Sequence, residues 1–282
     1  MFQFIFNFIL NLGALLRAPI GRERKIRILA IYVKLSIRYV LSTWFGYRET
    51  KCVKFLGMTV EGFSFKSIYF LFSEIFVKNE YFFVANSQTP IIFDCGANIG
   101  VAILYFKWLY PQSVVHAFEP DPTTAAMILT NSAHNDLHDV HVHMAALAAD
   151  DGEIDFFIEP LQSGSLKMSL VHRAENTEVV RVKTQKLSTF LNEYQSIDYL
   201  KMDIEGSELE VLKEISAAGS VSRIDGAVFE YHHHIGKKNA QLSEFLSILE
   251  VNNFDYIIAA RHSPGYKKFL FQDILVTCKR SD

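Results

Sequence analysis

The segment Asp94–Gly100 has the residue types expected of a turn that binds a nucleoside cofactor. An apolar run at 91–93 leads into it, and an apolar helical pattern begins at Ile99. Glycine allows the backbone to approach a ligand closely, and the first turn of the following helix presents unpaired amide donors. The candidate cofactor-binding residues of this segment are Asp94, Gly96, Asn98 and Gly100.

Glu119 ends the next apolar run, 23 residues after Gly96. In a strand–helix–strand unit, an acidic residue at the tip of the second strand can accept hydrogen bonds from ribose hydroxyls. Glu119 is therefore the candidate ribose ligand. The turn alone is weak evidence, because glycines also occur in ordinary strand-to-helix connections, but the turn and the acid together predict a nucleoside cofactor.

The spacing of the glycines bears on which cofactor binds. A dinucleotide-binding turn has the pattern GxGxxG, in which the second glycine admits the pyrophosphate. Asn98 occupies that position here, and Gly100 closes the turn one residue early. The spacing favours S-adenosylmethionine, and a nicotinamide-dependent oxidoreductase is the alternative.

Two carboxylates, Asp203 and Glu205, follow a second buried run at 199–202. Ligands of open α/β sheets bind at the carboxyl ends of the strands, so these carboxylates are expected beside the reactive end of the cofactor. A purely structural role as a helix cap is the alternative for Asp203 and for Ser207. It is also the role that we assign to Glu208.

A third apolar run, 224–229, ends in Glu230 and is followed by three consecutive histidines at 232–234. Neutral imidazole can take a proton from a hydroxyl, an effect worth about 10²–10⁴ in rate. Side chains alternate along a strand, so Glu230 and His232 share a face and are the candidates from this run. We expect His232 or Asp203 to deprotonate the acceptor, with Glu230 orienting the base.

The side chains of Asp203, Glu205, Glu230 and His232 could instead hold a divalent cation. Carboxylate oxygens and imidazole nitrogens are suitable ligands for such an ion, which would bind the acceptor oxygen. The sequence leaves this alternative open. The three cysteines are far apart in the sequence, so neither a zinc site nor a disulfide framework is expected.

From residue 89 onward, apolar runs alternate with amphipathic segments, which is typical of a parallel sheet covered by helices on both faces. The expected strands are 91–95, 114–119, 140–144, 199–202 and 224–230, and the expected helices are 99–110, 123–135, 207–216 and 240–252. An antiparallel pair, 254–260 and 269–277, should close the edge of the sheet. Two β-like pieces, 153–158 and 179–186, precede the fourth strand.

The composition divides the chain into three expected parts. Residues 1–50 form a helical extension, 51–88 a hairpin and helix that act as an adaptor, and 89–282 the cofactor-binding domain. The extension is apolar at 1–16 and basic at 17–38, where seven Lys and Arg accompany one acid, Glu23. The apolar part is too short to span a bilayer. We therefore expect either two helices packed on the domain or peripheral contact of residues 1–45 with anionic lipid.

Charge and cysteine content limit the classes of partner and location. A formal net charge of -3 gives no reason to expect nucleic acid as the partner. Few, separated cysteines suit a reducing compartment, so we expect a cytoplasmic protein, peripheral at the membrane if the extension contacts lipid. A non-catalytic nucleoside-binding protein associated with a membrane is a further alternative, although it would not need acids at 203, 205 and 230.

Four motifs together resemble the FkbM family of methyltransferases: FDCGANIG at 93–100, FEP at 118–120, KMDIEGSE at 201–208 and FEYH at 229–232. The resemblance covers about 51–278. It implies a class I methyltransferase fold, Rossmann-like, with a seven-stranded, mostly parallel sheet whose last strand is antiparallel. It also implies O-methylation of a hydroxyl on a sugar, glycan or related secondary metabolite.

The resemblance implies roles for individual residues as well. It places S-adenosylmethionine at Asp94, Gly96, Asn98, Gly100 and Glu119, and it places the transferred methyl beside Asp203 and Glu205. One departure is Met144-Ala145-Ala146 after the third strand, where relatives often carry a polar residue. A polar contact to adenine is therefore not carried over, and no motif identifies the acceptor.

Overall fold

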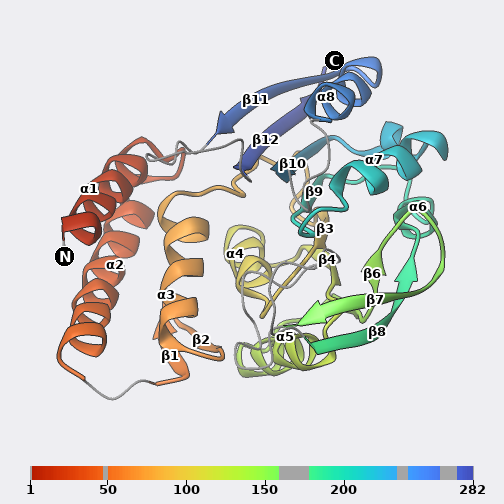
Figure 1. Cartoon of the computed structure of the whole chain (residues 1–282). Helices are drawn as coiled ribbons and strands as arrows, with labels where there is room; N and C mark the ends of the chain where they lie inside the picture. The colour runs from red at the N-terminus through yellow and green to blue at the C-terminus, as the bar shows by residue number, and fades with distance from the viewer. Residues whose placement is uncertain (1, 47–49, 159–177, 234–240, 261–271, 282) are drawn as a thin grey trace.

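The computed structural model describes residues 2–46, 50–158, 178–233, 241–260 and 272–281, and its centre is a seven-stranded sheet (Figure 1). The strand order is β11-β12-β10-β9-β3-β4-β5. The strands are β3 (Ile91–Cys95), β4 (Val114–Phe118), β5 (Val140–His143), β9 (Tyr199–Met202), β10 (Gly226–His233), β11 (Phe254–Ala260) and β12 (Gln272–Arg280). Strand β12 runs antiparallel to the other six strands, which all point the same way. The expected class I methyltransferase sheet is confirmed.

The expected antiparallel pair at the end of the chain is β11 and β12. Within it, β12 is the inner strand, because it also pairs with β10 from Gly226 opposite Lys279 to His233 opposite Gln272. The edge strand on this side of the sheet is therefore β11, and β5 is the edge strand on the other side. The predicted turn of this pair, within 261–271, and His234 lie outside the described residues.

The register of β3 determines which residues leave the sheet together at its carboxyl edge. Cys95, the last residue of β3, lies opposite Phe118 on β4 and Met202 on β9. The residues that follow these strand ends therefore emerge side by side: Gly96, Glu119 and Asp203. All four residues of β9 are buried, as expected of a central parallel strand covered on both faces.

Helices connect the strands and pack on the sheet (Figure 1). They are α4 (Val101–Leu109), α5 (Pro122–His134), α6 (Leu187–Leu191), α7 (Glu208–Ala217), η2 (Ser220–Arg223) and α8 (Leu242–Val251). Helix α4 begins two residues later than expected, because Gly100 has φ +85° and forms its N-cap. Helix α5 begins where Asp121 accepts hydrogen bonds from the N–H groups of Thr123 and Thr124.

Two differences between predicted and observed strands affect the site. Strand β10 continues three residues beyond the expected end at Glu230, so His232 lies within the strand rather than in a loop after it. The β-like pieces expected before β9 are confirmed, and they form a separate sheet. This sheet consists of β6 (Ala146–Leu147), β8 (Glu178–Gln185) and β7 (Gly152–Ile158).

The N-terminal part consists of α1 (Phe2–Arg17), α2 (Arg22–Trp44), β1 (Cys52–Phe55), β2 (Met58–Glu61), α3 (Phe65–Phe72) and the π-helical turn η1 (Ser73–Val77). Helix α2 packs on α3, where Tyr32 stacks on Tyr69 with ring centroids 6.0 Å apart. Turn η1 packs on α4 through Phe76 and Tyr105. The extension is thus a pair of helices packed on the rest of the protein. Among the described helices, none has the length and apolar character needed to cross a bilayer.

Asn131 of α5 and Asn135, the C-cap of this helix, join the β1–β2 hairpin to the sheet domain. The Asn131 amide accepts a hydrogen bond from the N–H of Glu61 (2.7 Å) and donates to the carbonyl oxygens of Glu61 (2.9 Å) and Ile99 (2.8 Å). Asn135 makes the equivalent pair of bonds with the backbone of Thr59. The hairpin is therefore held by the same helix that contacts the end of the glycine turn.

Candidate active site

A pocket opens at the carboxyl ends of β3, β4 and β9, where the sequence predicts the site. Its empty space, including solvent at the mouth, is about 850 Å³. Leu71, Ile75 and Tyr81 line it from the N-terminal part. The wall also includes Gly96 and the polar or charged residues Asn98, Glu119, Lys201, Asp203 and Glu205. Five of the nine predicted site residues therefore share one pocket.

Only glycine fits at position 96 of the turn. Gly96 has φ +83°, and a Cβ added to it would lie 1.8 Å from the carbonyl oxygen of Asp203. The N–H groups of Gly96 and Ala97 both donate to the carbonyl oxygen of Phe118, at 2.9 and 3.0 Å. The turn is thus held tightly between the ends of β4 and β9, and Asn98 lies on the pocket wall.

Asp94 and Gly100 are not among the residues that line the pocket. Gly100 lies at the start of α4, where its nearest side-chain neighbour is Ile128. Asp94 is fully buried, and its Oδ1 lies 3.2 Å from Nζ of Lys201. The structure therefore places both residues as supports of the turn.

Lys201 also lies on the pocket wall, although its position in the sequence did not predict this. Its Nζ donates to the carbonyl oxygen of Gly96 at 2.6 Å and lies 3.9 Å from Oδ2 of Asp203. Burial lowers the pKa of Lys201, but the carboxylates of Asp94 and Asp203 raise it above its usual value, so the side chain is a cation. The sequence feature that could have indicated this role is a lysine inside an otherwise apolar strand.

Glu119 is fixed at the end of β4 by the backbone on both sides of it. Its Oε2 accepts a hydrogen bond from the N–H of Asn98 (3.0 Å), and its Oε1 accepts one from the N–H of Asp121 (3.1 Å). Burial raises the pKa of Glu119 to about 7, against the hydrogen bonds that favour its charged form. This carboxylate is positioned on the pocket wall and titrates close to neutral pH.

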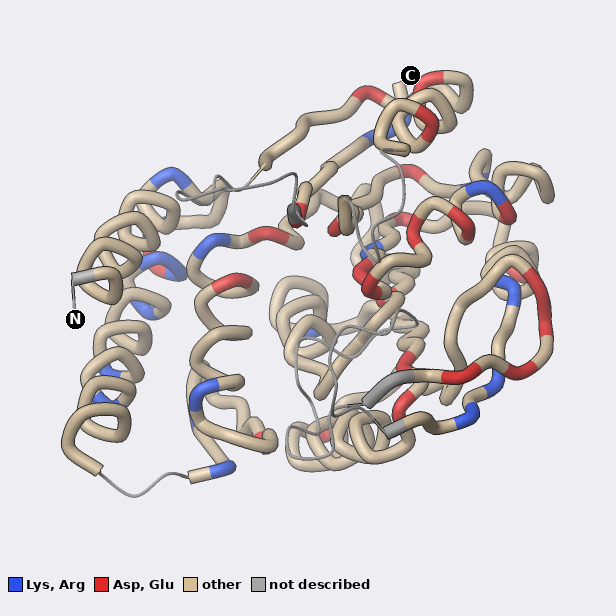
Figure 2. Tube along the Cα trace, viewed as in Figure 1, with Lys and Arg blue, Asp and Glu red and all other residues tan. Residues whose placement is uncertain are grey.

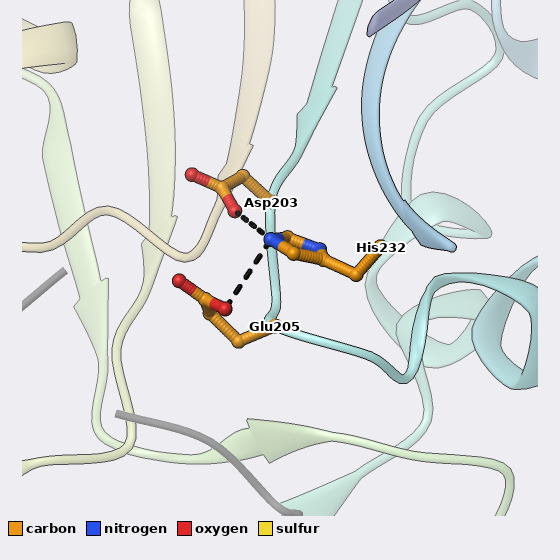
Figure 3. A group of neighbouring side chains, drawn as sticks. All are labelled: Asp203, Glu205 and His232. Atoms are coloured by element: carbon orange, nitrogen blue, oxygen red, sulfur yellow. Dashed lines mark ion pairs between the residues drawn. The ribbon is translucent and has the colours of Figure 1, made fainter. Parts of the chain in front are cut away.

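His232 lies at the centre of a group of acids drawn from several elements. Its Nε2 lies 3.2 Å from Oε2 of Glu205 and 3.7 Å from Oδ1 of Asp203 (Figure 3). Asp273 lies opposite His232 in the β10–β12 register, and its Oδ1 is 4.0 Å from the same nitrogen. Glu230 shares this group, since its carboxylate, His232 and Asp273 have ligand atoms within 4.8 Å of one another. The structure thus brings Asp203, Glu205, Glu230 and His232 together, and it adds Asp273, which was not foreseen.

Glu208 holds the other side of the His232 ring. Its Oε1 lies 2.7 Å from Nδ1 of His232 and accepts hydrogen bonds from the N–H groups of Gly206 (2.9 Å) and Ile204 (3.3 Å). The side chain is almost completely buried. Glu208 was expected only to cap the helix, and Glu230 was expected to orient the histidine, whereas Glu208 makes that contact. Ser207, the expected cap, makes no side-chain capping hydrogen bond to α7.

The surroundings of His232 determine its charge. Burial lowers the pKa of His232, but the carboxylates of Glu208 and Glu205 raise it well above its usual value. Burial and the nearby Asp203 carboxylate raise the pKa of Glu230 to about 9. The surrounding acids therefore favour the protonated form of His232, and burial favours the protonated form of Glu230. An imidazolium has no lone pair to accept a proton, so His232 in this state is not a general base.

Comparisons with known proteins identify the family to which the chain belongs. The model of the methyltransferase FkbM domain matches residues 94–258. A methyltransferase of Sordaria araneosa is 33% identical to the chain over an alignment of 178 positions, which covers 52% of this chain and 68% of the relative. The 31-O-demethyl-FK506 methyltransferase of Streptomyces tacrolimicus is 26% identical, with 71% of this chain and 87% of the relative covered.

A hexuronic acid methyltransferase of Haloferax volcanii is 24% identical, and the alignment covers 62% of this chain and 72% of that protein. The chain thus spans from about two thirds to most of the length of these three relatives. The family match includes the glycine turn, Glu119, both pocket acids and His232, and it extends over more than half of the sequence. The chain belongs to the FkbM family of methyltransferases.

Proposed function

We propose that this protein transfers the methyl group of S-adenosylmethionine to a hydroxyl oxygen of a sugar, a glycan or a related small molecule. The observation that carries the proposal is the convergence of Glu119, Asp203 and Glu205 on one pocket from adjacent strand ends. Two relatives are named for 31-O-demethyl-FK506 and for a hexuronic acid, which supports oxygen as the methylated atom and a small molecule or sugar as the acceptor.

The residues of the pocket fit S-adenosylmethionine in three respects. Glu119 offers carboxylate oxygens for the ribose hydroxyls. An apolar wall that includes Ala146, Leu147 and Phe156 suits the flat face of adenine without a polar contact. Asp203 and Glu205 supply negative charge for the sulfonium cation. The departure at Met144-Ala145-Ala146 therefore replaces a polar contact with apolar surface.

The positions of the acids suggest how the protein assists transfer. S-adenosylmethionine, when bound, supplies an activated methyl group on sulfur. Asp203 lies on the pocket wall with a quarter of its side chain exposed, so it is placed to accept the proton of the acceptor hydroxyl, whereas His232 lies behind it and is 3% exposed. His232 positions Asp203 and Glu205, and Glu208 positions His232. Holding the two reactants in line can lower the barrier by about 7–11 kcal/mol.

A divalent cation is the second candidate for this site. Two sets of ligand atoms share His232, one with Asp203 and Glu205 and the other with Glu230 and Asp273, and within each set the atoms lie within 4.8 Å of one another. These residues would hold an ion that binds the acceptor oxygen and stabilises its negative charge. Turnover that persists after dialysis against EDTA would leave Asp203 as the base. Turnover that is lost and then restored by Mg²⁺ would favour the cation.

Cofactor binding and turnover test the proposal separately. Calorimetry with S-adenosylhomocysteine and with NAD should show binding of the first only. Glu119→Ala should abolish this binding, whereas Glu153→Ala, at an exposed position of β7, should not. Binding of NAD alone would favour the oxidoreductase. Release of S-adenosylhomocysteine in the presence of hexuronic acids, glycans or macrolide alcohols measures activity. Binding of the cofactor with no turnover on any hydroxyl acceptor would favour the non-catalytic alternative.

A further inference from the structure

Helix α2 has two apolar faces, and only one of them is covered. Ile28, Tyr32 and Leu35 face the protein interior and are almost completely buried. A second row of large apolar side chains recurs every three or four residues along the whole helix and remains 36–57% exposed. Its members are Ile26, Leu29, Val33, Ile37, Leu41 and Trp44. A helix in water is expected to present polar residues there.

Helix α1 extends this exposed apolar surface. It packs beside α2, where Phe8 stacks on Tyr32 and Phe4 on Tyr39, at 5.1 and 5.5 Å between ring centroids. The two helices lie together at the outer side of the molecule, away from the sheet (Figure 1). The exposed apolar side chains of α1 are Ile5, Phe6, Ile9, Leu10 and Leu16, at 49–73% exposure. With Phe45, residues 1–45 carry 12 of the 21 exposed large apolar side chains of the described chain, so this concentration marks a binding surface.

The charge of the two helices is opposite to that of the rest of the protein. Residues 1–45 contain seven Lys and Arg and one acid, a net charge of +6, whereas the remaining residues have a net charge of −9. The blue segments on α1 and α2 mark these cations (Figure 2). Arg27 and Lys34 are exposed and follow one another at helical spacing beside the apolar row of α2. Glu23, which pairs with Arg27 at 2.6 Å, is the one acid of this segment and is already counted in its net charge of +6.

We propose that α1 and α2 form a docking surface for a membrane that contains anionic lipid. Apolar side chains bordered by lysine and arginine suit the boundary between headgroups and acyl chains. The negative charge of the sheet domain would turn this face, and not another, toward the bilayer. A second copy of the chain fits less well, because self-association through this face would bring the exposed Arg27 and Lys34 of two copies toward one another.

Vesicle co-sedimentation of the full chain tests the docking surface. Binding to vesicles of phosphatidylcholine and phosphatidylserine should exceed binding to phosphatidylcholine alone by about tenfold or more, and it should weaken as salt is added. Ile26→Ser with Ile37→Ser, and separately Arg27→Glu with Lys34→Glu, should each reduce binding about tenfold or more. Ile257→Ser is the matched control, because Ile257 is 74% exposed but lies on the edge strand β11.

Two outcomes would overturn the proposal. One is equal binding of the helix variants, the control and the unaltered protein. The other is a concentration-dependent dimer that Ile37→Ser abolishes, together with no binding of the protein to anionic vesicles. The altered side chains are exposed, so thermal unfolding and S-adenosylhomocysteine binding should stay unchanged. These two readouts separate a failure of this proposal from a failure of the proposed methyl transfer.

Discussion

Oε1 of Glu208 lies 2.7 Å from Nδ1 of His232, on the side of the ring that faces away from Asp203 and Glu205. The same oxygen accepts hydrogen bonds from the N–H groups of Gly206 and Ile204. One buried carboxylate therefore fixes both the histidine and the backbone that carries the two pocket acids. Its position at the start of α7 gives it a role in the geometry of the site.

Glu208→Gln should lower kcat about 10- to 100-fold, as loss of a carboxylate that orients a histidine does at other sites. The dissociation constant of S-adenosylhomocysteine should change little, because Glu208 does not line the pocket. Steady-state kinetics and calorimetry measure the two effects. Glu210→Gln, an exposed change on the same helix, is the control. Equal losses in kcat and cofactor affinity would argue for a general structural defect instead.

Asp203→Asn should lower kcat about 10²- to 10⁴-fold, because it removes the proton acceptor on the pocket wall. The amide keeps the shape of the side chain, so S-adenosylhomocysteine should still bind. Single-turnover measurements with saturating cofactor isolate the transfer step. Small and equal losses in both quantities would contradict the role assigned to Asp203.

Cofactor affinity should decrease as the pH falls through about 7, the pKa to which burial raises Glu119. The ionised carboxylate is the form that accepts both ribose hydroxyls, so affinity should fall roughly tenfold for each pH unit below the pKa. Calorimetry in buffers of different ionisation enthalpy should show a proton released on binding at pH 6 and none at pH 8. A flat affinity profile from pH 5 to 8 would exclude Glu119 as the ribose ligand.

The same pKa shift acts in the opposite sense on the stability of the ligand-free protein. The folded protein binds this proton more tightly than the unfolded chain, in which the pKa of Glu119 is near its ordinary 4.5. The resulting stabilisation is complete below pH 4.5 and is lost as the pH rises through about 7. Urea unfolding of ligand-free protein at pH 6 and pH 8 therefore serves as an internal control for the affinity measurement.

Gly96→Ala should lower the free energy of unfolding by about 3 kcal/mol or more and abolish cofactor binding, because the new Cβ would collide with the carbonyl oxygen of Asp203. Gly152→Ala is the matched control, since a Cβ there would meet its nearest atom, Oγ1 of Thr184, at 3.6 Å. Chemical unfolding measures both variants. Near-native stability of Gly96→Ala would show that β3 and β9 can separate at their ends.

The sequence predicts those parts of the site that lie within a few residues of a strand end. Gly96, Glu119, Asp203 and Glu205 each follow an apolar run, and parallel strands bring such residues to one edge. The central strands and their helices follow from the same alternation of apolar and turn residues. Their bounds are correct to within three residues.

The residues that were missed depend on contacts between distant segments. Asp273 joins the site only because β12 pairs with β10, and Tyr81 joins it only because η1 packs on α4. Glu208 looks like an ordinary residue of the first helical turn until His232 is placed against it. Lys201 lies in an apolar strand, and its role depends on Asp94, more than 100 residues earlier in the chain.

The hydrogen bonds of Asn131 have a consequence for hydrogen exchange. This side chain bonds the backbone of Glu61 in β2 and the carbonyl oxygen of Ile99 beside the turn, so β2 cannot detach without disturbing the residues that face the ligand. A nucleoside that locks the turn should therefore slow deuterium uptake at the amides of Thr59 and Glu61. Protection would reach a strand that does not touch the ligand.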